Sequence, residues 1–99
     1  MGFKVIFAPQ AIERLEELVR YIARDNPIAA EKFGLRLAER TALLADFPEI
    51  GQAYLKRKNV RRLGCKPYWI YYRVQPEKRI VEIMDFWHSA RRDPDIELI

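Results

Sequence analysis

The sequence predicts an α+β domain: an N-terminal strand, an antiparallel helical hairpin, and then a three-stranded antiparallel sheet with the helices packed on one of its faces. Two observations carry this prediction. Apolar residues recur at helical spacing on both sides of Asn26-Pro27, and the second half of the chain alternates as strands do. At 99 residues, the chain is long enough to bury one core, so we expect residues 1–99 to form a single domain.

The first two predicted elements are a short strand and a helix. Residues 3–7 alternate as a strand does. Pro9 ends that strand and suits the first turn of a helix, because its fixed φ is helical and its missing N–H would be unbonded there. The apolar face of this helix comprises Ile12, Leu15, Leu18, Val19 and Ile22.

The second helix is predicted to begin at Pro27, capped by Asn26, and to run to about Ala45. Gly34 lies inside it and costs about 1 kcal/mol relative to Ala, unless the partner helix packs close at that point. Two amphipathic helices joined by so tight a turn predict an antiparallel hairpin.

The second half predicts the sheet. After a loop at residues 47–51, strands are expected at 59–63, 68–75 and 79–88, with a turn at 64–67 and a hairpin at 76–78. Residues 56–58 are expected in irregular or edge structure. The tail, residues 93–99, has no clear period.

Side chains alternate between the two faces of a strand, so the hairpin predicts which residues face the helices. The more apolar set is assigned to the helical side: Tyr68, Ile70, Tyr72, Val74, Ile80, Met84 and Phe86. The other face is expected to carry Trp69, Tyr71, Arg73, Val81, Ile83, Asp85 and Trp87. A one-residue bulge would disturb this assignment.

Positive charge is concentrated in the second half of this basic protein. Residues 1–50 hold seven basic and eight acidic residues, a balance of −1, whereas residues 51–99 hold eleven and six, a balance of +5. This asymmetry suggests an acidic partner, either nucleic acid or an acidic protein segment, and a solvated basic surface is the alternative. The candidate contacts are Lys56, Arg57, Lys58, Arg61 and Arg62, together with Trp69, Tyr71, Arg73 and Trp87.

Each of these candidates has a structural alternative. The three aromatic residues fit an ordinary sheet core as well as a docking platform. Arg73 fits a cross-strand ion pair, with Asp85 or Glu82, as well as an anion contact. His88, the one histidine, fits a structural position at a strand end as well as a general acid or base.

Other classes of site find no support in the sequence. One cysteine, Cys65, allows no internal disulfide, and one His with one Cys is too few for a structural zinc site. Gly64 and Lys66 flank Cys65 in the predicted turn and favour a lowered pKa of its thiol, but no other residue accompanies it to form a cysteine site. No nucleophilic triad or phosphate loop is present, so we expect no cofactor and no metal. Without a signal peptide or membrane span, the expected location is the cytoplasm.

Several segments in order resemble one known family. They are Ala11 to Ala23, Asn26 to Phe33, Phe47 to Gly51, Val60 to Leu63, Pro67 to Val74 and His88 to Pro94. No single segment is specific, but their order and spacing together resemble the RelE/ParE superfamily of type II toxin–antitoxin toxins over nearly the whole chain. The resemblance implies the fold predicted above and a cognate antitoxin, expected to be acidic and amphipathic, in a hetero-oligomer with the toxin.

The resemblance also implies a choice between two activities. The RelE-like branch cleaves messenger RNA on the ribosome and typically reads Tyr-Arg-x-x-Tyr in the strand where this chain has Tyr68-Trp69-Ile70-Tyr71-Tyr72. Trp69 stacks on a base but cannot bind a phosphate as a guanidinium does. The resemblance therefore favours the ParE-like branch, whose members inhibit DNA gyrase and are typical of plasmid-stabilisation modules.

Two alternatives remain open. In a ribosome-dependent endoribonuclease, Arg73 and Arg91 would neutralise the phosphate, His88 would move a proton, and Lys56 or Lys58 would support attack by the 2′-hydroxyl. The second alternative is an interaction module that has lost toxicity.

Overall fold

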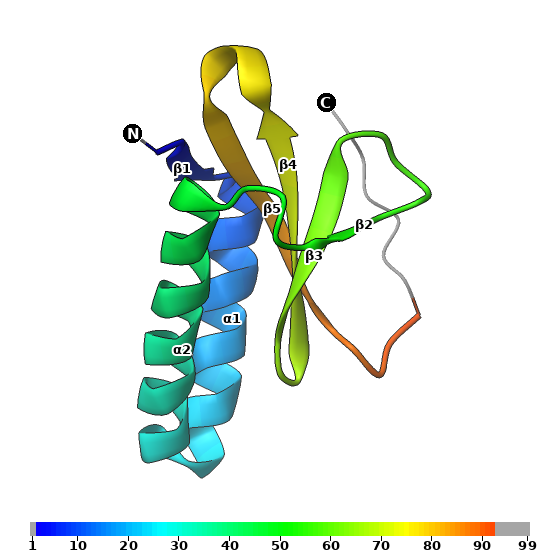
Figure 1. Cartoon of the computed structure of the whole chain (residues 1–99). Helices are drawn as coiled ribbons and strands as arrows, with labels where there is room; N and C mark the ends of the chain where they lie inside the picture. Colours follow the sequence, from blue (N-terminus) through cyan, green and yellow to red (C-terminus); the bar gives the residue numbers. More distant parts are fainter. Residues whose placement is uncertain (1, 93–99) are drawn as a thin grey trace.

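The computed structural model describes residues 2–92, so the prediction for the tail lies outside the described residues. Two helices and five strands form the described part, joined by one short 3-10 helix, η1 (Figure 1). The elements in chain order are β1 (Lys4–Phe7), α1 (Pro9–Asp25), α2 (Pro27–Asp46), β2 (Gln52–Ala53), β3 (Val60–Cys65), β4 (Tyr68–Gln75), η1 (Pro76–Lys78) and β5 (Ile80–His88).

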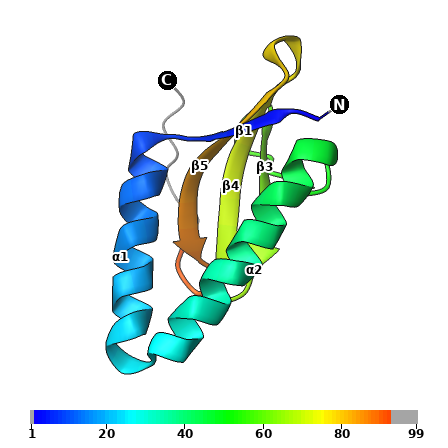
Figure 2. The ribbon, with the colours of Figure 1, turned by 90° about the vertical axis from the view of Figure 1, so that its left-hand side faces the viewer.

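The predicted α+β class is confirmed, and the sheet is larger than expected. Its strand order is β1-β5-β4-β3-β2, so the three predicted antiparallel strands form its middle and one edge strand is added on each side. β1 runs parallel to β5, and the Lys4 N–H donates to the Arg79 carbonyl at 2.9 Å. β2 is a two-residue strand paired with β3, in a segment too short for its alternation to be visible in the sequence. Both helices lie on the same side of the sheet (Figures 1 and 2).

The turn between the helices is the one predicted. The Asn26 side chain accepts a hydrogen bond from the Ala29 N–H at 3.0 Å, and Pro27 is the first residue of α2. This cap satisfies one of the N–H groups that a helix start leaves unbonded. The hairpin is therefore fixed by local chemistry as well as by its apolar faces.

Gly34 is not explained by close helix packing. A Cβ built on this residue would have no atom within 4 Å outside the helix's own backbone. We therefore expect Gly34→Ala to raise the free energy of unfolding by about 0.5–1 kcal/mol, because Ala loses less backbone entropy on folding and meets no obstruction here. Urea denaturation of the two proteins measures this difference. An unchanged or lower urea midpoint for Gly34→Ala would contradict this expectation.

Two apolar clusters cover the two faces of the sheet. The larger lies under the helices and includes Phe33, Leu37, Tyr72, Val81 and Ile83. The smaller lies on the other face, hereafter the open face. It consists of Tyr54, Val60, Tyr71 and Met84, with Trp69 and Trp87 packed against it.

The face assignment is correct along β4 and partly wrong along β5. Val81 and Ile83 lie under the helices and Met84 lies on the open face, the reverse of the prediction. The reason is a register shift: Tyr71 pairs with Asp85 whereas Tyr72 pairs with Ile83, so β5 has one extra residue at that point. A bulge of this kind reverses side-chain alternation on one side of it only. Phe86 and Trp87, beyond the bulge, lie on the predicted faces.

Candidate partner-binding site

The β2–β3 loop, residues 54–59, carries three of the predicted basic residues, Lys56, Arg57 and Lys58. The loop is closed on itself. The Tyr54 N–H donates to the Val60 carbonyl at 2.9 Å, and the Arg57 N–H donates to the Tyr54 carbonyl at 3.1 Å. Tyr54 is buried and meets Tyr71 edge to face, with 5.2 Å between ring centroids. Hydrogen bonds within the loop and the buried Tyr54 ring therefore hold the loop in place.

Leu55, beside these cations, is 95% exposed. Sequence reasoning missed it, although an apolar residue between a tyrosine and three consecutive cations was a visible signal. The Leu55 side chain is therefore available for contact with a partner. We call residues 54–59 the anchor loop.

Arg62 and Trp69 form a stacked pair on the open face. The Arg62 guanidinium carbon lies 4.1 Å from the centroid of the Trp69 ring. The same guanidinium donates to the Tyr71 hydroxyl at 3.2 Å and to the Gln52 side-chain oxygen at 3.2 Å. Trp69 is half-buried, whereas Tyr71 is fully buried and supports the surface from beneath. The Trp69 ring and the stacked Arg62 guanidinium therefore contribute a planar cation–π surface to the open face. The Tyr71 ring is buried beneath that surface and is not part of it.

The other two arginines predicted as partner contacts, Arg61 and Arg73, already bind groups within the fold. Arg73 pairs with Glu82 on β5 at 2.6 Å, which confirms the cross-strand alternative with Glu82 as partner. Arg61 points away from the open face and donates to the Gly51 carbonyl at 2.8 Å. That contact helps to hold Gly51 where its N–H donates to the buried Tyr72 hydroxyl, whose pKa burial raises. Arg61 and Arg62, adjacent in sequence, thus have different roles.

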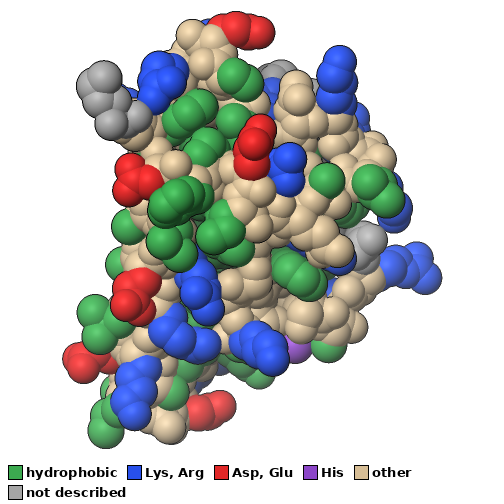
Figure 3. Space-filling model, in the orientation of Figure 1, with side chains coloured by type: hydrophobic (Ala, Val, Ile, Leu, Met, Phe, Trp, Pro, Cys, Tyr) green, Lys and Arg blue, Asp and Glu red, His purple; other side chains and the backbone are tan. Residues whose placement is uncertain are grey.

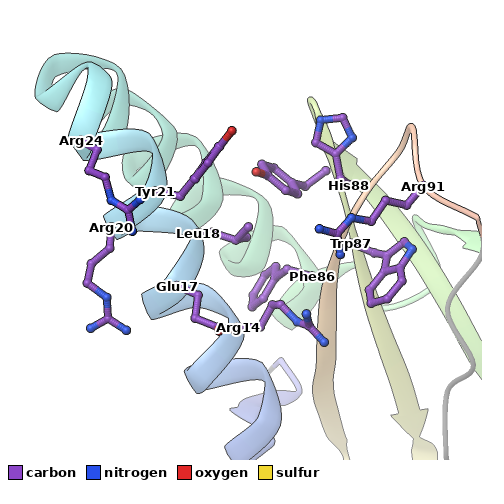
Figure 4. A pocket seen from close by; sticks show the side chains of 11 residues that line it. Arg14, Glu17, Leu18, Arg20, Tyr21, Arg24, Phe86, Trp87, His88 and Arg91 are labelled. Atoms are coloured by element: carbon purple, nitrogen blue, oxygen red, sulfur yellow. The ribbon is translucent and has the colours of Figure 1, made fainter.

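A cleft of about 590 Å³ opens between α1 and the end of β5 (Figure 4). We call it the α1–β5 cleft. In Figure 4, Tyr21 and Leu18 point from α1 toward the sheet, while Arg91 reaches back toward α1 from beyond β5. The cleft is lined by Arg14, Glu17, Leu18, Arg20, Tyr21, Arg24, Tyr68, Phe86, Trp87, His88 and Arg91. Its surroundings are basic, and in Figure 3 a Lys or Arg side chain lies directly beside His88, the purple residue.

His88 has a structural partner on each side. Its Nδ1 accepts a hydrogen bond from the Ala90 N–H at 3.0 Å, and its ring meets Tyr68 edge to face at 5.2 Å. Arg91 lies over the Trp87 ring, 5.6 Å from the centroid. Of the three candidate nuclease residues, the structure therefore brings only His88 and Arg91 into one cleft.

Arg73 lies far from that pair. On β4, Arg73 is five positions after Tyr68, which pairs with His88, and this corresponds to about 17 Å at the rise of an extended strand. Lys56 and Lys58 lie on the anchor loop, whose pocket is lined by Arg61, Val74 and Pro76 and shares no residue with the α1–β5 cleft. The residues proposed for a nuclease are thus distributed over three places.

Other kinds of site find no support in the described residues. Cys65 is buried, and that burial raises the pKa of its thiol above the usual value, so the lowered pKa considered from the sequence is wrong. Within residues 2–92, no group of three or more His, Cys, Asp or Glu side chains is placed to hold a metal ion. Neither described helix is long and apolar enough to cross a bilayer.

A two-helix hairpin on one face of a twisted sheet, with basic and aromatic residues on the other, defines the fold class of the RelE/ParE toxins. The chromosomal ParDE toxin–antitoxin system from P. aeruginosa matches at a TM-score of 0.73 with 16% identity, over 88% of this chain and 96% of that one. The RelBE2 toxin–antitoxin complex from Mycobacterium tuberculosis matches at 0.65 with 20% identity, over 89% and 99%. At these sequence identities, the structural similarity shows a shared fold and nothing more.

The sequence comparisons show the family. Residues 5–93 match the model of the ParE toxin of the type II toxin–antitoxin system parDE. Toxin RelE2 of Caulobacter vibrioides is 33% identical over 89 residues, covering 89% of this chain and 97% of the relative. Y4kP of Sinorhizobium fredii, a candidate toxin by its name, is 32% identical over 88 residues, 88% of each chain. The chain belongs to the ParE toxin family and is a toxin of the type II toxin–antitoxin class.

Proposed function

We propose that this toxin inhibits DNA gyrase, stalling it on DNA, and that it does so by binding rather than by catalysis. The anchor loop and the Arg62–Trp69 pair form the contact surface, with cations flanking an exposed apolar side chain. Gyrase holds its own DNA, so a stalling protein needs a recognition surface and no chemistry of its own.

The dispersal of the candidate nuclease residues carries this proposal. General acid–base cleavage requires a proton-transfer group and a phosphate-binding cation within hydrogen-bond reach of one phosphodiester. Arg73 is paired with Glu82 and lies about 17 Å along the sheet from His88. Trp69 occupies the position at which the resemblance implies an arginine in an RNA-cleaving relative.

A supercoiling assay with purified gyrase tests the proposal. We expect micromolar toxin to abolish the conversion of relaxed plasmid to the supercoiled form. Gyrase that keeps its full activity at these concentrations would overturn it.

A second candidate function is ribosome-dependent cleavage of messenger RNA. It is favoured by one observation, that His88 and Arg91 share the α1–β5 cleft, where an imidazole and a cation lie close to aromatic surfaces. Mapping of mRNA 5′ ends after toxin induction distinguishes the two. New ends within codons would support the nuclease, and toxicity that survives His88→Ala with Arg91→Ala would exclude it.

We further propose that a cognate acidic antitoxin neutralises this toxin in a hetero-oligomer. The solved relatives named above include toxin–antitoxin complexes, and the surplus of positive charge in the second half of the chain suits an acidic partner. Coexpression with the protein encoded beside the toxin gene is expected to restore growth. If the toxin expressed alone leaves growth unaffected, the chain is instead an interaction module without toxicity.

A further inference from the structure

α2 is apolar on the side that faces away from the sheet as well as on its buried side. Ile28 is 68% exposed and Leu35 is 64% exposed. Ala42, the next residue at this spacing, is exposed too. Residues seven apart in a helix return to within about 20° of the same direction, so these three side chains form one line, hereafter the α2 stripe. The buried residues Phe33 and Leu37 are each two positions from Leu35, which directs them to the opposite side of the helix.

An apolar stripe of this kind is unusual on the outside of a domain. A surface helix is normally apolar toward the core and polar toward water, and a helix that is apolar on both sides is normally covered on both. In Figure 3, apolar and charged side chains alternate along the left-hand edge of the molecule, where α2 lies in Figure 1. The exposed fractions of Ile28 and Leu35 show that the described chain leaves the stripe uncovered. The stripe is therefore a candidate docking face, and the charges beside it indicate which occupant fits.

Two residues of opposite charge flank the α2 stripe on one side. Lys32 and Glu39 are themselves seven residues apart, so they share a direction, about 40–60° around the helix from Leu35. Both are exposed, and neither forms an ion pair with another of residues 2–92. Along the helix axis, Lys32 lies about 4.5 Å before Leu35 and Glu39 about 6 Å after it. The two charges are therefore placed almost symmetrically about Leu35.

We infer that this chain forms a symmetric dimer in which the α2 stripes of two copies pack against each other in antiparallel orientation. A twofold axis beside Leu35 brings that residue onto its own copy and Ile28 onto the partner's Ala42. The axis reverses the order of residues along the helix, so Lys32 lies opposite the partner's Glu39 and Glu39 opposite the partner's Lys32. Self-complementarity of this kind is what a twofold interface requires.

The other flank of the stripe supports the antiparallel orientation. It holds the small residues Gly34 and Ala38, and a Cβ built on Gly34 would have no atom within 4 Å outside the helix's own backbone. An antiparallel pair brings this small flank against its own copy, which lets the two helices approach closely, and it brings the charged flank against its own copy. A parallel pair would place Lys32 opposite the partner's Glu31 and leave Glu39 without a cation.

The dimer leaves the proposed target surface free. α2 contributes to the apolar cluster under the helices, whereas Tyr54 of the anchor loop contributes to the cluster on the open face, so the two surfaces lie on opposite sides of the sheet (Figure 1). A dimer formed through α2 therefore presents two anchor loops that face away from the shared interface. Each protomer keeps its own target surface, so the inference does not depend on the proposed function.

Sedimentation equilibrium of the purified full chain across the micromolar range tests for the dimer. One helix of each protomer forms the interface, which places it at the small end of specific contacts. We therefore expect a micromolar dissociation constant, with monomer at the lowest concentrations and dimer at the highest. A chain that stays monomeric at every concentration overturns the inference.

Charge reversal tests the antiparallel arrangement. Lys32→Glu and Glu39→Lys each place like charges across the interface, so we expect each to weaken the dimer at least about 10-fold. The double variant restores both ion pairs with reversed polarity, and its dissociation constant should lie within about threefold of the parent's. A variant that merely disturbs the fold would not be rescued by the second change. A double variant as weak as the single ones overturns the inference.

Leu35→Asp and Leu55→Asp form a matched pair that tests the apolar stripe. Both replace an exposed leucine, but Leu55 lies on the anchor loop and is 95% exposed. We expect Leu35→Asp to be monomeric where the parent is dimeric and Leu55→Asp to dimerise as the parent does, with both folded by circular dichroism. Equal loss in the two variants, or loss in neither, overturns the inference. So does a monomeric parent in which Leu35→Asp weakens binding to gyrase or to the antitoxin encoded beside the toxin gene, because the stripe then belongs to that protein.

Discussion

Asp85→Ala is expected to lower the free energy of unfolding by about 3 kcal/mol. Asp85 is 3% exposed and accepts hydrogen bonds from the Gln10 side chain at 2.9 Å, from Arg14 Nε at 3.1 Å and from the Phe86 N–H at 2.8 Å. Removing it leaves a half-buried guanidinium and a buried N–H without their acceptor, and losses of this kind are among the largest that single substitutions cause. The same carboxylate joins α1 to β5, so the cleft should loosen as well.

Glu82→Ala is the matched control for this prediction. Glu82 is also a carboxylate on β5 that pairs with an arginine, Arg73, but its side chain is 22% exposed. Because solvent screens such a pair, we expect a loss of about 1 kcal/mol or less. Urea denaturation followed by circular dichroism measures both. Equal losses in the two variants would show that Asp85 does not fix the junction of α1 with the bulge.

Leu55→Ala is expected to weaken gyrase inhibition about 10-fold or more while leaving the unfolding midpoint unchanged. The side chain is 95% exposed, so the fold loses no packing, and a partner pocket that encloses it loses an apolar contact of hot-spot size. The measurement is the toxin concentration that halves supercoiling.

Leu35→Ala provides the comparison, since Leu35 is 64% exposed on α2 and distant in sequence from the anchor loop. We expect it to inhibit as the parent does. If Leu55→Ala inhibits equally well, the loop does not contact gyrase. If both leucine variants lose activity together, the effect is one of general surface hydrophobicity.

The predictable part of the fold was set by local chemistry. Asn26-Pro27 specified the helix turn through a side-chain cap, and unbroken alternation placed every β4 side chain on its correct face. Along β5 the alternation failed at one bulge. The Asp85 carboxylate that bonds the Phe86 N–H, Gln10 and Arg14 lies at this bulge, and the two α1 partners come from 75 and 71 residues away. No local pattern contains such contacts.

The site was predictable in composition but not in arrangement. The sequence predicted a basic and aromatic site, but in the structure Arg61 and Arg62 serve different faces and Tyr71 is fully buried. The α1–β5 cleft was missed except for His88, Arg91 and Trp87, because most of its α1 wall is formed by residues outside the apolar face predicted for that helix. Which arginine is already paired depends on tertiary contacts, so it could be read only from the structure.

The proposed activity is tested most directly by trapping gyrase on DNA. Purified gyrase, ATP and supercoiled plasmid are incubated with the toxin, and the reaction is stopped with detergent and protease to release any DNA held in a cleaved state. We predict linear plasmid that increases with toxin concentration and does not form when gyrase is omitted. Plasmid that stays intact and fully supercoiled with gyrase at every toxin concentration, in a preparation that arrests growth, would contradict the proposal.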